Sequence, residues 1–266
     1  MEATEFQTIY DTFANTEYGQ QLKASIRFEK YNLGDLSHEE WCELLGTDAN
    51  NLHHMWETYV LAQQFIASQN KSDKPSIDAR STEIQLLSAI IHDQAEYFAG
   101  DISYSDKTTL DEKYEITVFE QNLDAMNPGM DTATKSMARS AIRGVIFDSS
   151  TKEGTLFNAI ERTGYLATAI HAAGQLPTIT NPKTANGIHW LITDVLLNQV
   201  PTLVEYAQTY SYPDELLTQN AELISVFFAH TTDDVFRHYK DKSRQKKQDF
   251  IKAQQAWATF CSSHSL

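Results

Sequence analysis

Apolar residues recur every three or four positions through most of the chain, and no long segment alternates apolar with polar residues. The first spacing places apolar side chains along one stripe of an α-helix, whereas alternation would indicate a β-strand. Only six prolines and ten glycines interrupt the 266 residues. The pattern therefore predicts an all-α protein.

Polar segments containing proline or glycine separate the predicted helices. "QNKSDKPSID" and "NPGMD" are two such breaks. Ser37 is suited to cap a helix start, because its hydroxyl can accept from the exposed amide groups of the first turn. The predicted helices cover residues 5–27, 37–45, 50–68, 81–100, 110–123, 132–146, 155–173, 185–210, 215–238 and 243–262. No fixed repeat or long linker interrupts them, which favours a single helical domain over residues 1–266.

Charge and cysteine content exclude several classes of protein. The formal net charge of −15 disfavours binding to nucleic acid or an anionic membrane surface. No apolar run approaches the length of about 18 residues needed to span a bilayer, and the N-terminus lacks a basic leader region. The two cysteines, 219 positions apart, form neither a disulfide scaffold nor a zinc-ribbon motif. The expected location is a reducing cytoplasm.

The candidate chemistry lies in "LLSAIIHDQAEYFAGDISYSDK", residues 86–107. On a continuous helix Glu96 would stand one turn beyond His92 and Asp93, so the three side chains could line one pocket. The apolar residues before them predict a buried helix, in which an unpaired charge is costly. A metal ion would offset that cost. The simpler alternative is a buried His–Asp pair without metal.

The string "HDQAEYFAGDI", residues 92–102, followed by Lys107, resembles the HD-domain metal-dependent phosphohydrolases. Its spacing is closest to the pattern H-D-x-x-E-x-x-x-G-D-[IL] of the branch that contains bacterial 5′-deoxynucleotidases. The resemblance covers about residues 50–175 and implies an HD-domain helical bundle. The additional helices, within residues 1–49 and 176–266, would either shape the pocket or form the face of a homodimer.

The family also places a histidine on the preceding helix, in a string such as H-x-W. "NNLHHMWETYVLA" supplies His54 in that position, 38 residues before His92. His53 is the competing candidate, and a shift of one residue turns a helical side chain by about 100°.

The fourth ligand of the family is an aspartate, and the best match here is Glu161, 68 residues after Asp93. The longer glutamate side chain would need a different placement to reach the same ion. The alternative for Glu161 is an ion pair with a neighbouring arginine, Arg162 or Arg143. Asp148 and Asp194 are weaker substitutes for the ligand role.

The resemblance implies one divalent ion, Mn, Co, Mg, Zn or Fe, held by His54, His92, Asp93 and Glu161. Such an ion activates water and polarises a phosphoryl group. HD-fold di-iron oxygenases place further histidines between the HD pair and the last acid. Residues 94–160 contain no histidine, which favours a hydrolytic site with a single metal ion.

The implied substrate is a nucleotide or another small phosphate ester. Glu96 would act as general acid or base, Lys107 would balance phosphate charge, and Asp101 would fix the loop or contact a sugar hydroxyl, unless it is an ordinary turn residue. The arginine expected in a phosphate pocket is one of four unranked candidates, Arg27, Arg139, Arg143 and Arg162.

Two other hypotheses stay open. The deoxynucleotidase branch has an Arg-Trp pair before its first histidine, and this chain has none. That difference and Glu161 favour the first alternative, a catalytically inert HD-fold protein that binds or senses a nucleotide. The second is a helical scaffold in which the motif is accidental.

Overall fold

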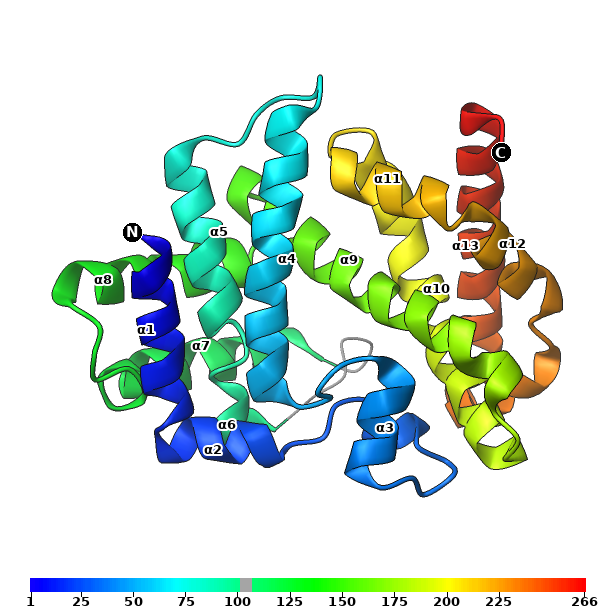
Figure 1. Cartoon of the computed structure of the whole chain (residues 1–266), viewed down its shortest axis with the longest axis horizontal. Coiled ribbons are helices and arrows are strands. Elements are labelled where there is room, and N and C mark those ends of the chain that lie inside the picture. Colours follow the sequence, from blue (N-terminus) through cyan, green and yellow to red (C-terminus); the bar gives the residue numbers. More distant parts are fainter. Residues whose placement is uncertain (101–106) are drawn as a thin grey trace. The chain divides into compact units, whose positions relative to one another are not determined.

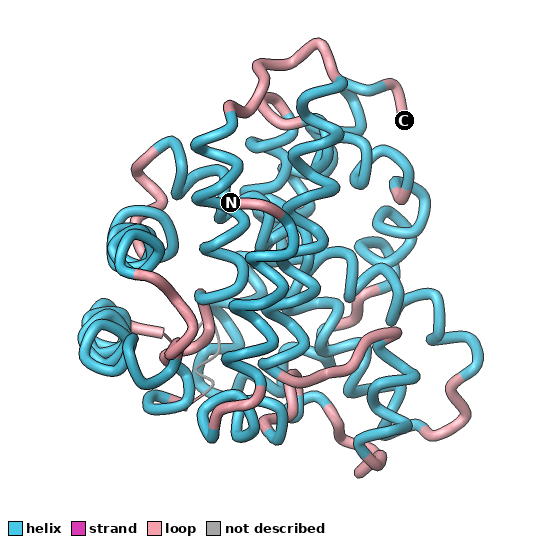
Figure 2. Tube along the Cα trace, turned by 60° about the vertical axis from the view of Figure 1, so that its left-hand side comes forward, coloured by secondary structure: helices cyan, strands magenta, loops and turns pink. Residues whose placement is uncertain are grey.

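The computed structural model describes residues 1–100 and 107–266. Helices dominate this part of the chain, and no β-strand occurs in it (Figure 1). Figure 2 shows the same arrangement as helices joined by loops. One isolated antiparallel bridge joins Ile26 to Asn50. The prediction of an all-α fold is confirmed.

The helices have the following bounds. The α-helices are α1 (Ala3–Ala14), α2 (Glu17–Ala24), α3 (His38–Leu45), α4 (Asn51–Lys71), α5 (Ala79–Ile91), α6 (Glu96–Ala99), α7 (Thr109–Met126), α8 (Thr132–Ala141), α9 (Lys152–Gln175), α10 (Pro182–Ala207), α11 (Ser211–Gln219), α12 (Ala221–His230) and α13 (Ser243–His264). Short 3-10 segments cover Glu29–Tyr31, Leu176–Thr178 and Asp233–Lys242, and a π-helical turn covers Ile142–Ile146.

The chain divides into two compact units. Unit 1 comprises Met1–Arg27, Asn50–Lys71 and Ser76–Glu161, and unit 2 comprises Phe28–Ala49, Ser72–Pro75 and Arg162–Leu266. Helix α9 begins in unit 1 and ends in unit 2.

Unit 1 is built around α4 and α5, which pack along one another. Helix α1 packs on α5, α2 packs on α4, and α8 covers another side of α5. Every residue in the second half of α5 is buried, so this helix has no solvent-facing stripe there. The fully buried side chains between these helices include Phe6, Phe13, Met55, Phe65, Leu87 and Ile90.

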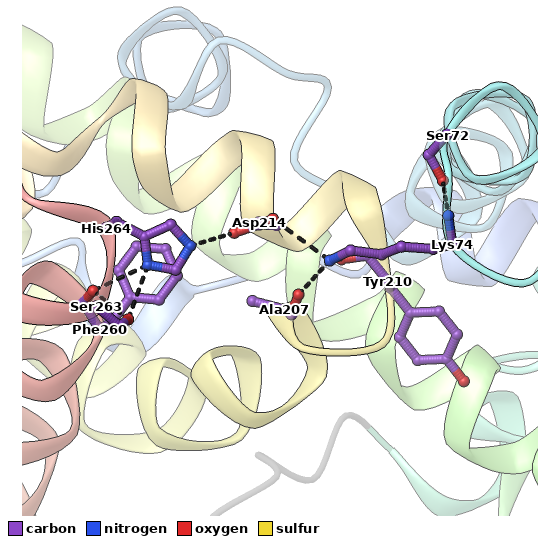
Figure 3. A network of polar contacts seen from close by, with 8 residues as sticks. All are labelled: Ser72, Lys74, Ala207, Tyr210, Asp214, Phe260, Ser263 and His264. Atoms are coloured by element: carbon purple, nitrogen blue, oxygen red, sulfur yellow. Dashed lines mark hydrogen bonds and ion pairs between the residues drawn. The ribbon is translucent and has the colours of Figure 1, made fainter.

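Unit 2 is organised by α10, which packs along α13 and also contacts α11. The segment between α4 and α5 is tied to this unit by Lys74 (Figure 3). Its ammonium group donates to the carbonyls of Ala207 and Tyr210 and lies 3.3 Å from Asp214 Oδ2. The other oxygen of Asp214 lies 2.9 Å from Nε2 of His264, near the end of α13. One carboxylate thus links a loop, α11 and the C-terminal helix.

Three predicted helices differ from the structure, two of them because polar side chains end a helix early. The helix predicted over residues 5–27 is two helices: the Thr16 hydroxyl donates to the carbonyl of Phe13 and accepts from the amide of Gly19, which ends α1 and begins α2. The helix predicted over 215–238 is divided at Asn220, whose side-chain amide donates to the carbonyl of Leu216. Its second part ends at His230, and a 3-10 segment begins at Asp233. The helix predicted over 132–146 keeps its α-helical hydrogen bonds only to Ala141 and finishes as the π-helical turn.

Candidate metal centre

His92 and Asp93 stand where α5 ends, which corrects the prediction of one helix over residues 81–100. The ring of His92 donates from Nδ1 to the carbonyl of Ala89, 2.9 Å away. In a continuing helix this carbonyl would accept from the amide of Asp93. The following amides bond three residues back instead, from Gln94 to Ile91 and from Glu96 to Asp93. Glu96 therefore begins a separate short helix, α6.

Helix α4 brings His54 to the HD pair. Nε2 of His54 lies 3.8 Å from Oδ2 of Asp93, and its ring centroid lies 5.1 Å from that of His92. The neighbouring His53 points about 100° away around the helix and pairs with Glu57 at 3.6 Å. Of the two candidates, His54 is the histidine that meets the pair.

The donor atoms of His54, His92 and Asp93 all lie within 4.8 Å of one another. Nε2 of His92 is 3.3 Å from Oδ2 of Asp93. Nitrogen and oxygen ligands about 2.1 Å from a metal ion lie about 3.0 Å apart in octahedral sites and about 3.4 Å apart in tetrahedral ones. The spacing of these three side chains is close to that of a ligand set.

Arg27 completes the cluster from another part of the sequence. Nη1 of Arg27 lies 3.2 Å from Oδ2 of Asp93, and the whole residue is only 8% exposed. The bridge between Ile26 and Asn50 holds this arginine beside the start of α4. Arg27 is thus the arginine, of the four candidates, that reaches the HD pair.

The cluster keeps its groups in defined charge states. Burial, reinforced by Arg27, holds the pKa of His54 well below its usual value. Burial alone would favour a neutral Asp93, but His92, His54 and Arg27 outweigh it and hold the pKa of this carboxyl far below its usual range. Burial also opposes a charged His92, yet Asp93 and then Glu161 raise the pKa of this imidazole overall.

The donor chemistry fits a divalent metal ion. The hydrogen bond from Nδ1 of His92 to the carbonyl of Ala89 turns Nε2 toward Asp93, which is the usual ring orientation of a metal-bound histidine. Nε2 must lose the proton that Asp93 favours before it can bind an ion. His54 is neutral and Asp93 is ionised, as ligands must be. These three residues could hold the ion, and Arg27 is the cation that would compete with it for Asp93.

Glu96 is buried beside this cluster. Its Oε2 accepts from the side-chain amide of Asn51 at 2.5 Å. Asn51 is itself buried and lies one turn before His54 on α4, so the same helix carries a candidate ligand and the residue that orients Glu96. The sequence analysis did not identify Asn51, although its spacing of three residues from His54 was a usable signal.

Lys107 lies in unit 1 against Glu115 of α7. Its ammonium group is 2.8 Å from Oε2 of Glu115, which is 1% exposed, and lies over the ring of Phe147. Burial opposes the charge on Lys107, but Glu115, and then Asp93 and Glu96, raise its pKa overall. Lys107 is therefore within electrostatic reach of the cluster, and Glu115 is a partner that the sequence analysis missed.

Asp101, the remaining residue of the motif, lies outside the described residues.

Glu161 is not among the residues whose donor atoms lie within 4.8 Å of one another, although its charge acts on His92. Its two suggested arginine partners are engaged elsewhere: Arg143 pairs with Glu120, and Arg162 donates to Gln199 at 2.6 Å. The weaker substitutes also have other roles. Asp148 accepts from the amide and hydroxyl of Ser150, and Asp194 accepts from Tyr31 and Tyr239 within unit 2.

Comparison with family models, with curated proteins and with solved structures finds no match to this chain. The resemblance to the HD-domain phosphohydrolases thus depends on the quoted motifs. Among the described residues, no helix combines the length and the apolar character needed to cross a membrane.

Proposed function

We propose that this protein is an HD-type, metal-dependent phosphohydrolase that cleaves a phosphate ester of a nucleotide or a similar small metabolite. The observation that carries the proposal is the convergence of His54, His92 and Asp93, drawn from two helices, with their donor atoms within 4.8 Å of one another. Glu96, the buried Arg27 and the partly buried Lys107 accompany these donors.

His54, His92 and Asp93 would hold the divalent ion. Such an ion, when bound, supplies a Lewis acid that activates water and polarises the phosphoryl group. Two of the three ligands are prepared beforehand, because burial holds the pKa of His54 low and the surrounding nitrogens hold the pKa of Asp93 low, whereas His92 would release a proton when the ion binds. Glu161 is kept as the proposed fourth ligand, because its negative charge raises the pKa of His92.

Glu96 is the proposed general acid or base. The amide of Asn51 holds one of its oxygens, which fixes the direction of the other. A carboxylate fixed in this way can take a proton from water or return one to the leaving oxygen without first reorganising. Asn51 is thus a positioning residue for Glu96.

Arg27 and Lys107 would bind the oxygens of the phosphate group. A guanidinium can make two parallel hydrogen bonds to a phosphate, so Arg27 would exchange part of its contact with Asp93 for the substrate. Lys107 would contribute a point charge from its place beside Glu115. These local cations would attract a small anion even though the whole chain carries a net charge of −15.

The test is a screen for phosphate release from nucleoside mono-, di- and triphosphates and from sugar phosphates, with Mn²⁺, Co²⁺ or Mg²⁺ added. We expect hydrolysis of at least one compound, a loss of about 100-fold or more in Glu96→Gln, and no activity in His92→Ala. His53→Ala is the matched control, since this histidine lies next to His54 but pairs with Glu57. Hydrolysis that persists unchanged in both Glu96→Gln and His92→Ala would refute the proposal.

A second candidate function is a metal-free protein that binds a nucleotide or another phosphate compound. The contact between Arg27 and Asp93 favours it, because a guanidinium already occupies the position of a counter-ion to this carboxylate. The two functions differ in metal content. Wild-type protein whose metal content equals that of His54→Ala, even after incubation with Mn²⁺, would support the metal-free candidate.

A further inference from the structure

A second group of metal-ligating side chains lies in unit 2 and contains His38, Cys42 and Asp48. His38 and Cys42 are four residues apart on α3, so their side chains share one face of this helix. Helix α3 ends at Gly46, whose left-handed φ of 69° turns the chain and returns Asp48 to that face. A site with a single cysteine lacks the paired-cysteine spacing by which metal sites are identified from a sequence.

The three donor atoms form a nearly equilateral triangle. Nε2 of His38 is 3.5 Å from Sγ of Cys42 and 3.5 Å from Oδ1 of Asp48, and Sγ is 3.8 Å from Oδ1. In a tetrahedral zinc site, with Zn–S about 2.3 Å and Zn–N or Zn–O about 2.0–2.1 Å, neighbouring ligand atoms lie about 3.3–3.6 Å apart. The triangle matches one face of such a tetrahedron.

We propose that His38, Cys42 and Asp48 form a Zn²⁺ site that is separate from the candidate hydrolytic centre. Water would take the fourth position, because His38 and Asp48 are exposed and Cys42 is only half-buried. Coordination replaces the thiol proton of Cys42, which leaves to solvent, and it requires no change of oxidation state. The sulfur ligand selects Zn²⁺ over Mg²⁺ or Ca²⁺.

The backbone around the triangle is already fixed. Ser37 caps α3 in a reciprocal pair of hydrogen bonds with Glu40, which holds the turn that carries His38. The amide of Ala49 donates to Sγ of Cys42 at 3.3 Å, which fixes the position of the sulfur. The ring of His171 lies so close to Gly46 that a Cβ there would be 2.5 Å from its Nε2. Helix end, turn and thiol are thus held together before any ion binds.

The alternative is a simple ion pair between His38 and Asp48 with a thiol beside it. In that alternative the Cys42 thiol donates to Oδ1 of Asp48 and His38 pairs with the same carboxylate, so the three distances are the same and metal binding is what distinguishes the two arrangements. The ion would fasten α3 to the segment that follows it, so Zn²⁺ should also stabilise unit 2.

Titration of the whole protein with Co²⁺ tests the proposal, because cobalt bound to a thiolate gives a near-ultraviolet charge-transfer band. The His54, His92 and Asp93 cluster has no sulfur and cannot produce this band. We expect the band in wild type, in His54→Ala and in the matched control Cys261→Ser. We expect its loss in Cys42→Ser, and its displacement by one equivalent of Zn²⁺.

Two further variants test the geometry. His38→Ala and Asp48→Ala keep the thiol, and each should weaken Co²⁺ binding at this site at least tenfold while circular dichroism stays that of wild type. Metal analysis after incubation with Zn²⁺ should give about one ion per chain less in Cys42→Ser than in Cys261→Ser. The proposal is overturned if wild type gives no band with excess Co²⁺, or if the band persists in Cys42→Ser.

Discussion

Nη1 of Arg27 lies 3.2 Å from Oδ2 of Asp93, although 66 positions separate the two residues in the sequence. Both are buried, and the same carboxylate oxygen lies 3.3 Å from Nε2 of His92 and 3.8 Å from Nε2 of His54. The contact connects the two functional hypotheses. Under these hypotheses Arg27 would stabilise the metal-free protein, compete with a divalent ion, and bind a phosphate group.

Arg27→Gln should separate these roles. Removal of one partner from a buried ion pair should lower the free energy of unfolding of the metal-free protein by about 3 kcal/mol. Divalent ions should bind about tenfold more tightly, because about 1.4 kcal/mol of repulsion is relieved. Denaturant unfolding and Mn²⁺ titration measure the two effects. The control is Arg143→Gln, at an exposed arginine. Equal Mn²⁺ affinity in wild type and Arg27→Gln would show that Arg27 does not compete with the ion for Asp93.

Asn51→Ala should impair catalysis without loss of metal. The variant removes the amide that donates to Oε2 of Glu96, so kcat should fall by about tenfold or more while KM and metal content stay near those of wild type. The control is Asn122→Ala, whose side chain donates within its own helix, to the carbonyl of Val118. If KM rises and kcat does not change, Asn51 contacts substrate instead of positioning Glu96.

Lys107→Met should destabilise unit 1, because it leaves Glu115 buried without its cation. The expected cost is about 3 kcal/mol, and a second change, Glu115→Leu, should restore most of it because the buried charge is then gone as well. Urea unfolding of the two single variants and the double variant measures the coupling. Lys135→Met, at a surface pair with Asp124, should have little effect. Additive losses in the double variant would show that Lys107 and Glu115 act independently.

Asp194 should be the polar residue on which unit 2 depends most. It accepts from Tyr31 at 2.5 Å and from Tyr239 at 2.9 Å, and Lys246 lies 3.8 Å away. Asp194→Ala should cost about 3 kcal/mol or more, since it strands two buried hydroxyls and a lysine.

Tyr31→Phe should cost less, about 1.5–3 kcal/mol, because it removes one hydrogen bond to a charged acceptor. Thermal unfolding compares these variants with Asp233→Ala, which removes an exposed pair with Lys247. A smaller loss in Asp194→Ala than in Tyr31→Phe would contradict this assignment.

Helix content and most helix positions followed from the sequence. Apolar spacing depends on the pitch of the helix alone, so it predicted α4, α7, α9, α10 and α13 within a few residues at each end. Breaks made by side-chain hydrogen bonds were missed, as at Thr16 and His92, because a threonine or histidine is compatible with either a continuing or an ending helix.

For the candidate site, the sequence by itself determined the chemistry: His54, His92, Asp93 and Glu96 as residue types at a specific spacing. The tertiary structure decided which side chains meet at the site and which residues surround them. It selected His54 over His53, chose Arg27 from four arginines, and supplied Asn51 and Glu115 as partners. The physical reason is that sequence patterns and tertiary contacts act over different distances along the chain. Periodicity and spacing report on neighbours within a few turns of one helix, whereas a buried charge finds its partner across helices, through packing that no local pattern records.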